Sequence, residues 1–181
     1  MPTPVAHGLM GAMVVAALGP RGAPRRNWKI LLIGCGLGAA PDLDVILNLL
    51  RVGDANWHHD FTHSIAFALL AGLAAAAMLM KEPGWKAALI FGAATATHPL
   101  LDFIFTSSDG VELLWPLSAD RFALGSQGFG IYGLRHDSLT HGAEDLLKTI
   151  VAELLLYGSM LAAVLLSRGR PARTQSFIAQ E

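Results

Sequence analysis

Histidine and aspartate residues are the side chains of this sequence that could do chemistry, and their spacing groups them. His98 and Asp102 stand four residues apart, so on a helix both would lie on one face and could bind the same ion. His59 and His63 repeat this spacing. Imidazole and carboxylate ligands without thiolate suit a divalent cation, zinc first, with manganese or magnesium as alternatives. The predicted metal ligands are numerous enough for two ions: His7, Asp42, His58, His59, His63, His98 and Asp102.

Residues 41–44, Pro-Asp-Leu-Asp, carry two carboxylates that cannot share one face of a continuous helix. A break at the proline, with a helix restarting there, would turn both toward a cavity. Asp42 is predicted as a metal ligand, and Asp44 as a general base, a further ligand or a residue that orients one. Asp60 and Glu153 are the other candidates for the general base. For Glu153, a metal ligand and a buried hydrogen bond are equally open interpretations.

The composition places the chain in a membrane. It has 181 residues, 53% of them hydrophobic and 15% charged, and a mean hydropathy of +0.47. Soluble domains have about 45–50% apolar and about 25% charged residues, so the excess points to lipid. The net charge of -1 and the dispersed Lys and Arg residues offer no basic surface for nucleic acid. The single cysteine, Cys35, is predicted to be a packing residue.

Apolar runs predict an all-α fold, a polytopic membrane bundle of about five helices in a single domain over residues 1–181. The first run is short for a span and the second contains ionisable residues, so either is expected to be tilted or broken. Glycine and alanine in the second and third runs predict close helix contacts. A long loop or lid at 106–148 precedes the last helix, and a tail begins at about 167. The five runs lie at residues 5–19, 30–50, 64–80, 87–105 and 149–166.

Basic residues predict the orientation of the bundle. Nine Lys and Arg residues fall in the connections at 20–29 and 81–86 and in the tail, against four on the other side. Because such residues are retained in the cytoplasm, the C-terminus is predicted to be cytoplasmic and the N-terminus outside. His136, His141 and Glu144 are interpreted as solvated loop residues. All four tryptophans lie near segment ends and are interpreted as interfacial anchors: Trp28, Trp57, Trp85 and Trp115.

In this topology, ionisable residues from five segments converge on the outer face of the membrane. An Asp within a span costs about 2.5–3.5 kcal/mol on insertion scales, so such residues usually face a bundle interior or an aqueous cavity. A bound cation would compensate for this cost, because each ligand gains a coordination bond in place of lost water. The depth of these residues therefore favours a metal site independently of their spacing.

The ordered set of motifs resembles the YdjM family of bacterial inner-membrane proteins, over about residues 5–120. The resemblance implies a bacterial inner-membrane location and a metal-dependent hydrolase. Its most specific piece looks like H-R-G-x-T-H-S, with His59 and Asp60 where that pattern has Arg and Gly. The resemblance implies His58 and His63 as metal ligands, whereas helical spacing favours His59 and His63. Both His58 and His59 therefore remain candidate ligands. The motifs that carry it are His7, Pro41-Asp42-Leu43-Asp44, His58 to Ser64, His98 to Asp102 and Leu114-Trp115-Pro116.

The function that the sequence favours is a membrane-bound metal-dependent hydrolase, in which a metal-activated water attacks a phosphorus or carbonyl centre. Placement near the outer leaflet favours a lipid or lipid-linked phosphoester as substrate. A more distant similarity in ligand order to the zinc-dependent phospholipase C group, taken as an analogy, points the same way. The first alternative is a non-catalytic membrane protein with a structural metal or polar cluster. The second, less favoured, is an ion or proton transporter. The oligomeric state is not predicted.

Overall fold

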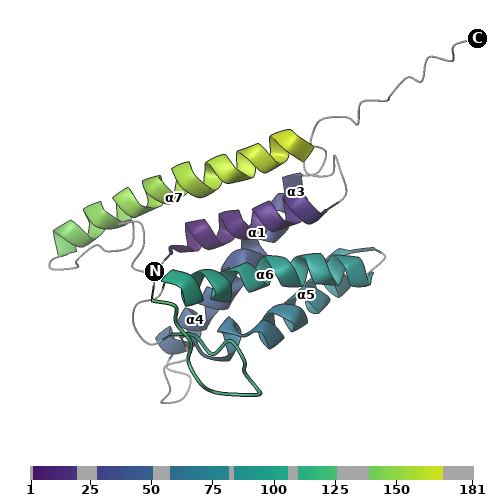
Figure 1. Ribbon diagram of the computed structural model, residues 1–181, viewed down its shortest axis with the longest axis horizontal. Coiled ribbons are helices and arrows are strands. Elements are labelled where there is room, and N and C mark those ends of the chain that lie inside the picture. The colour runs from purple at the N-terminus through teal and green to yellow at the C-terminus, as the bar shows by residue number, and fades with distance from the viewer. Residues whose placement is uncertain are drawn as a thin grey trace, which may run out of the picture.

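The computed structural model describes residues 2–19, 28–50, 58–81, 84–105, 110–125 and 139–168. These residues form a helical bundle (Figure 1), and within them no β-strand occurs beyond an isolated bridge between Val111 and Phe122. The all-α prediction is confirmed. The elements are α1 (Pro4–Leu18), α3 (Trp28–Ala39), η1 (Ala40–Leu43), α4 (Asp44–Leu49), η2 (Phe61–His63), α5 (Ile65–Leu79), α6 (Trp85–Phe105) and α7 (Leu139–Arg168).

Two helices in the described part of the chain are long and apolar enough to cross a membrane, Trp85–Phe105 and Gly142–Arg168. α1 and α5 have 15 residues each. At 1.5 Å per residue they are about 22 Å long, shorter than a hydrocarbon core of about 30 Å. α5 packs along α6, and α1 packs against α3, α6 and α7. The short helices thus lie against the longer ones.

The second predicted run is broken at its proline, as the sequence indicates. α3 ends at Ala39, a 3-10 turn occupies Ala40–Leu43, and α4 begins at Asp44. Proline lacks the N–H that a continuing helix needs and clashes with the preceding turn. The break allows Asp42 and Asp44 to lie near opposite nitrogens of His63, and each also approaches a further histidine, as described below.

The start of the last helix differs from the prediction. α7 begins at Leu139 rather than at residue 149, because its first turns are polar and carry no apolar run. An ion pair of 2.8 Å between Glu144 and Lys148, four residues apart, stabilises these exposed turns. Assigning His141 and Glu144 to a loop was therefore wrong, since both lie on α7. His136 lies outside the described residues.

Glycines allow α1 and α3 to touch through their backbones. A Cβ atom on Gly11 would lie 2.2 Å from the carbonyl oxygen of Gly34, and one on Gly38 would lie 2.2 Å from that of His7. Such distances are too short for any side chain, so only glycine fits. α5 and α6 meet in the same way, at Gly72 and Gly92. The predicted close contacts are confirmed, and they hold the end of α3 beside the start of α1.

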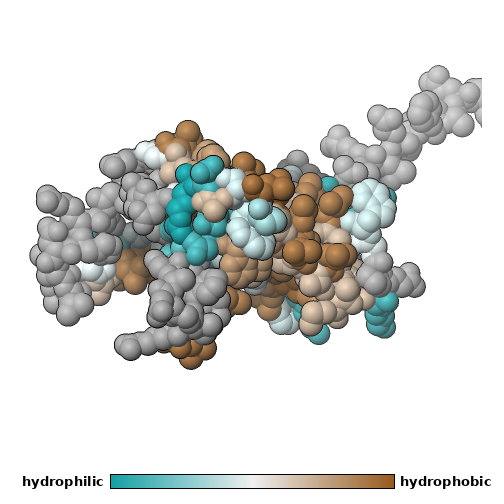
Figure 2. Space-filling model, turned by 90° about the horizontal axis from the view of Figure 1, so that it is seen from below, coloured by the Kyte–Doolittle hydropathy of each residue, from teal (hydrophilic) through white to brown (hydrophobic). Residues whose placement is uncertain are grey.

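The outward side of the bundle is apolar along much of its length. On the face in Figure 2, hydrophobic residues cover much of the right-hand part, and hydrophilic residues gather toward the left. Exposed hydrophobic residues include Leu70 and Met78 on α5 and Leu155 on α7. Apolar side chains exposed over several turns suit contact with lipid.

Candidate metal centre

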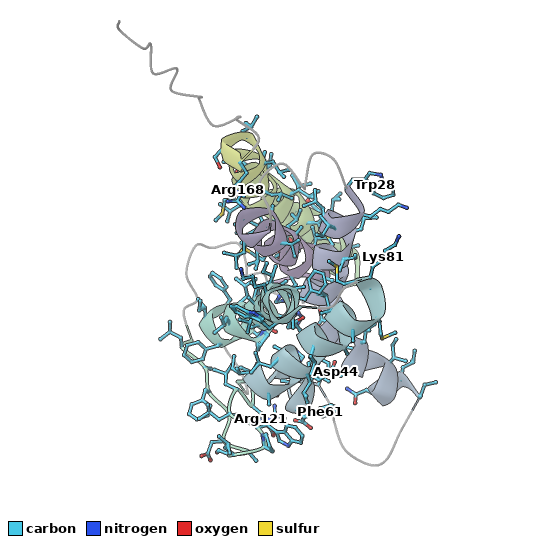
Figure 3. All side chains as sticks on the ribbon, turned by 90° about the vertical axis from the view of Figure 1, so that its right-hand side faces the viewer. Trp28, Asp44, Phe61, Lys81, Arg121 and Arg168 are labelled. Carbon is cyan, nitrogen blue, oxygen red and sulfur yellow. The ribbon has the colours of Figure 1, made fainter. Side chains whose placement is uncertain are left out.

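The predicted residues gather at one end of the bundle. The starts of α1, α5 and α7 and the end of α6 all lie toward the left in Figure 1. Figure 3 shows Asp44, Phe61 and Arg121 in one region, apart from Trp28, Lys81 and Arg168. The convergence predicted from the order of the segments is thus present in the fold.

Three ligand atoms from two elements form the centre of the cluster. His63 Nε2 lies 3.1 Å from His98 Nε2, and Asp102 Oδ2 lies 3.5 Å and 3.2 Å from these two nitrogens. All three side chains are 1% exposed or less. In a tetrahedral zinc site with bonds of about 2.0–2.1 Å, ligand atoms lie about 3.3 Å apart. The spacing of these three atoms therefore matches the edges of such a site.

Asp42 and His7 extend the cluster from η1 and α1. Asp42 Oδ1 lies 3.3 Å from His98 Nε2 and 4.0 Å from His63 Nε2. The ring of His7 stacks on that of His98 at 3.7 Å, and its Nε2 lies 3.5 Å from Asp102 Oδ1. Ligand atoms of His7, Asp42 and His98 all lie within 4.8 Å of one another. Five predicted ligands thus share one cluster at the junction of four segments.

The far nitrogen of each central imidazole is held by a partner. His98 Nδ1 lies 2.8 Å from the carbonyl oxygen of Gly38, which can only accept, so this nitrogen carries the proton. His63 Nδ1 lies 3.0 Å from the Thr62 hydroxyl, which donates to Asp44 at 2.8 Å. His63 Nδ1 also lies 3.4 Å from Asp44 Oδ2, so it too donates. Both Nε2 atoms of the neutral rings therefore present lone pairs to the cluster.

His58 and His59 form a second group beside His63, with ligand atoms within 4.8 Å of one another. The reasoning from helical spacing was wrong, because residues 58–63 form a turn and a 3-10 segment rather than an α-helix. His58 Nδ1 lies 3.0 Å from Asp44 Oδ1, and this carboxylate raises the pKa of His58. Burial lowers the pKa of His59 to about 4, so its ring is neutral at pH 7. Both histidines lie within reach of His63, and the choice between them stays open.

His59 has an unusual backbone. Its φ of 70° lies in the left-handed region, which is costly for a residue with a side chain. Its carbonyl oxygen accepts a hydrogen bond of 3.2 Å from the Glu112 backbone N–H. Its Nε2 is buried without a hydrogen-bond partner. Strained residues tend to occur at functional sites, and the His59 ring lies 4.1 Å from that of His58 and 5.0 Å from that of His63.

The three predicted general bases have different surroundings. Asp44 is 2% exposed and binds His58, His63 and Thr62, so it acts on the cluster through them. Asp60 is partly exposed and pairs with Arg121.

Glu153, from α7, is fully buried and binds both the backbone N–H and the hydroxyl of Thr3, the residue that caps α1. Because Thr3 is the partner of Glu153, the structure favours the buried hydrogen bond among the three interpretations of this residue. Its carboxylate ties α7 to the start of α1.

Buried polar atoms without partners test whether a cation fits this cluster. In the described residues they include His7 Nδ1, His59 Nε2 and both carboxylate oxygens of Asp102. A buried polar atom left unsatisfied costs about 1–3 kcal/mol. Two imidazole lone pairs and a carboxylate pointing at one volume repel one another unless a positive charge lies between them. The donor set therefore fits a divalent cation, with imidazole and oxygen ligands that suit zinc or manganese.

Comparison with known proteins places the chain in a family. Residues 1–170 match the YdjM inner membrane protein family. The chain belongs to this family. The inner membrane protein YbcI of Escherichia coli K12 is 32% identical to it over 129 residues, which cover 67% of this chain and 72% of that protein. No solved structure matches the chain. The resemblance found from the motifs is confirmed, and the YdjM-family chain is an inner-membrane protein.

Sequence reasoning missed two contributors to the cluster and one residue beside it. The Thr62 hydroxyl joins His63 to Asp44, whereas the neighbouring Ser64 caps α5 through Phe67 N–H. Gly38 contributes its carbonyl oxygen to His98. Arg121 pairs with Asp60 beside the cluster. Thr62 belongs to the H-R-G-x-T-H-S motif, so the motif could have identified it. The Gly38 carbonyl is a backbone group, and the sequence carries no signal for it.

Proposed function

We propose that this YdjM-family chain is a membrane-bound metal-dependent hydrolase. The observation that carries the proposal is the convergence of His63 Nε2, His98 Nε2 and Asp102 Oδ2 at separations of 3.1–3.5 Å. These three atoms would hold the ion, zinc or alternatively manganese or magnesium, together with Asp42 and His7. His58 and His59, which lie beside His63, would contribute ligands to a second ion.

The residues around the cluster would keep these ligands in place. A divalent ion bound there would supply a Lewis acid that lowers the pKa of water and polarises a phosphoryl or carbonyl oxygen. Asp44 and Thr62 hold His63 in the tautomer that leaves Nε2 unprotonated, and Gly38 does the same for His98. Asp42, whose side chain is 23% exposed, provides the side of the cluster that a substrate can reach.

A general base is required to take a proton from the attacking water. Solvent exposure favours Asp60 as this base, because its side chain is 22% exposed within the turn at residues 58–63. Asp44 and Glu153 are buried and hydrogen-bonded, which supports a positioning role for the first and a structural role for the second.

A lipid or lipid-linked phosphoester near the outer leaflet is the proposed substrate. The residues of the cluster lie at one end of the bundle. Arg168 contacts Gly19, just after the end of α1, and Lys81 follows the end of α5; both of these helices end toward the right in Figure 1. Because basic residues are retained in the cytoplasm, this supports a cluster facing the periplasm and a cytoplasmic C-terminus.

Complete burial favours a second candidate function, a structural metal or polar cluster that only holds the bundle together. His63 and His98 are 0% exposed, as expected for a closed coordination shell. A transporter would need ionisable residues across the whole bilayer. The buried ionisable residues of the described segments gather at one end instead.

Metal content measured by mass spectrometry on the detergent-purified protein tests the proposal. The wild type is expected to hold at least one divalent ion per chain, and His98→Ala and Asp102→Ala are expected to lose it. Thr97→Val is the matched control, because Thr97 lies on the same buried stretch of α6 but binds only the Ala94 carbonyl. A folded wild type that stays metal-free after reconstitution would refute the proposal. Bound metal without turnover in a phosphoester screen would favour the structural cluster.

A further inference from the structure

Residues 111–124, here called the strap, cover the end of the bundle that carries the cluster (Figure 1, green trace below α6). Glu112 N–H donates to the His59 carbonyl at 3.2 Å, and Leu113 accepts from Ile65 N–H at 3.1 Å. Leu124 N–H donates to Phe103 at the end of α6 at 2.7 Å. The strap is thus fixed to the histidine turn and to the helix that carries Asp102.

The strap brings a cation to this turn. The Arg121 guanidinium pairs with Asp60 and lies 3.9 Å from a Glu112 carboxylate oxygen. Its side chain remains 30% exposed. A guanidinium has five N–H donors in a planar fork, so two carboxylates can hold it while donors stay available to a ligand. Among the described residues, Arg121 is the one cationic side chain in contact with the turn at residues 58–63.

The strap also exposes several large apolar side chains, alongside the carboxylate of Asp120. Leu117 is 91% exposed, and Leu114, Trp115 and Leu124 are exposed as well. The Trp115 ring packs against Phe61, 5.7 Å away. Tryptophan is enriched where a membrane meets water, and leucines exposed beside it would be costly in water alone. Since the chain is an inner-membrane protein, these exposed apolar residues suit contact with the lipid headgroup region.

We propose that the strap is the binding surface for the phosphate headgroup of a bilayer lipid, with Arg121 as the residue that recognises the phosphate. This inference rests on the proposed function, because it names how the substrate of the same site is selected. Leu117 and Trp115 place the strap in the headgroup layer, and Arg121 reaches the phosphate with paired N–H donors. Arginine matches phosphate oxygens in this bidentate way, whereas a neutral glyceride offers no charge to pair. Arg121 thus determines specificity by binding the phosphate, and hydrolysis of the bound phosphoester is assigned to the metal site.

Binding of short-chain lipids to the detergent-purified full chain tests the proposal. Dioctanoyl phosphatidic acid, dioctanoylglycerol and inorganic phosphate serve as probes in isothermal titration calorimetry, with and without chelation of metal. The wild type is expected to bind the phosphatidic acid at least about tenfold more tightly than the glyceride, and Arg121→Gln to lose about ten- to a hundredfold of that affinity. Lys148→Gln, which removes an exposed cation on α7, is the matched control and should bind as the wild type does.

Two further variants keep the test decisive. Asp60→Asn combined with Arg121→Gln avoids leaving an unpaired carboxylate if the single variant misfolds. Leu117→Asp should weaken binding of the phosphatidic acid and leave that of inorganic phosphate unchanged. Equal affinity of wild type and Arg121→Gln would overturn the proposal, and so would equal affinity of the wild type for phosphatidic acid and glyceride. Tighter binding of free phosphate than of the lipid would overturn the lipid assignment.

Metal content measured on the same samples separates this inference from the proposed function. If a protein that holds no metal still prefers phosphatidic acid over the glyceride through Arg121, the hydrolase proposal is refuted and the proposed lipid-binding role of the strap is supported. If the protein binds metal but Arg121→Gln does not change its lipid affinity, the role of the strap is refuted and the hydrolase proposal is not.

Discussion

Asp44 acts on the cluster through other side chains. One of its oxygens accepts from Thr62 and lies 3.4 Å from His63 Nδ1, while the other lies 3.0 Å from His58 Nδ1. Because the proton on His63 Nδ1 points at this carboxylate and hydroxyl, the lone pair on Nε2 points at His98 and Asp102. A carboxylate behind a metal-binding histidine fixes the ring and increases its basicity.

Replacing Asp44 by Asn is therefore expected to weaken metal binding about ten- to a hundredfold, without removing any ligand atom of the central group. Titration of metal-stripped protein with zinc against a competing chelator would measure the change. Asp120→Asn, in an exposed carboxylate bonded to Ser118, is the control and should have no effect. An unchanged zinc affinity in Asp44→Asn would show that His63 needs no such support.

The strain at His59 gives a second prediction at this scale. His59→Gly and His59→Ala both remove the imidazole, but only glycine adopts a φ of 70° freely. The glycine variant is expected to be more stable than the alanine variant by about 1 kcal/mol, or about 2–4 °C in Tm. Thermal unfolding in detergent, followed by tryptophan fluorescence, measures this difference. Equal midpoints would mean that the turn relaxes out of the left-handed conformation.

Residue types and the expected positions of the helices were enough to predict which side chains form the centre of the cluster. His98 and Asp102 follow from helical spacing, because α6 continues through both. The His58 and His59 alternative could not be settled in this way, because a 3-10 turn changes which side chains share a face. A left-handed backbone at a histidine and a ligand-orienting threonine depend on contacts with distant segments, which local sequence does not encode.

At the scale of elements, Gly38 joins three helices. A Cβ there would meet the His7 carbonyl of α1 at 2.2 Å, and the Gly38 carbonyl accepts from His98 of α6. Gly38→Ala is expected to destabilise the protein by about 1–3 kcal/mol through overpacking and to lower its metal content. Gly36→Ala is a closely matched control, since it lies on the same helix with nothing within 4 Å of its Cβ. Equal stability of the two variants in thermal unfolding would contradict the backbone contact.

Glu153 connects α7 to the start of α1 through Thr3. Glu153→Leu is expected to cost about 1–3 kcal/mol of stability, because it leaves the partly buried N–H and hydroxyl of Thr3 without their partner. Metal stoichiometry should stay that of the wild type. Mass spectrometry and thermal unfolding on the same sample separate the interpretations, since loss of metal from a folded variant would make Glu153 a ligand after all.

The helices themselves were largely predictable, because a span in lipid must be apolar and must satisfy its own backbone. The runs at 64–80 and 87–105 coincide with α5 and α6 to within a few residues. The first turns of α7 could not be found in this way. They are exposed and polar, and the pair of Glu144 and Lys148 stabilises them rather than burial.

For the whole molecule, the two ends of the bundle differ in chemistry. One end carries the buried histidines and the strap. The other, where α1 and α5 end and α6 begins, carries Lys81, Lys86 and a cavity of about 280 Å³ with an apolar lining that includes Ile30 and Phe91. The asymmetry agrees with the orientation that the basic residues predict, in which the cluster faces the periplasm. This orientation decides whether substrates come from the outer or the inner leaflet.

Cysteine labelling in intact cells tests that orientation. In a Cys35→Ala background, Ala119→Cys on the exposed strap is expected to react with a membrane-impermeant maleimide added from outside. Lys81→Cys, exposed at the other end, is expected to react only after the membrane is permeabilised. The two variants control for each other, because both sites are exposed in the purified protein and should react equally there. The reverse pattern in cells would place the cluster in the cytoplasm, and the lipid bound by Arg121 would then come from the inner leaflet.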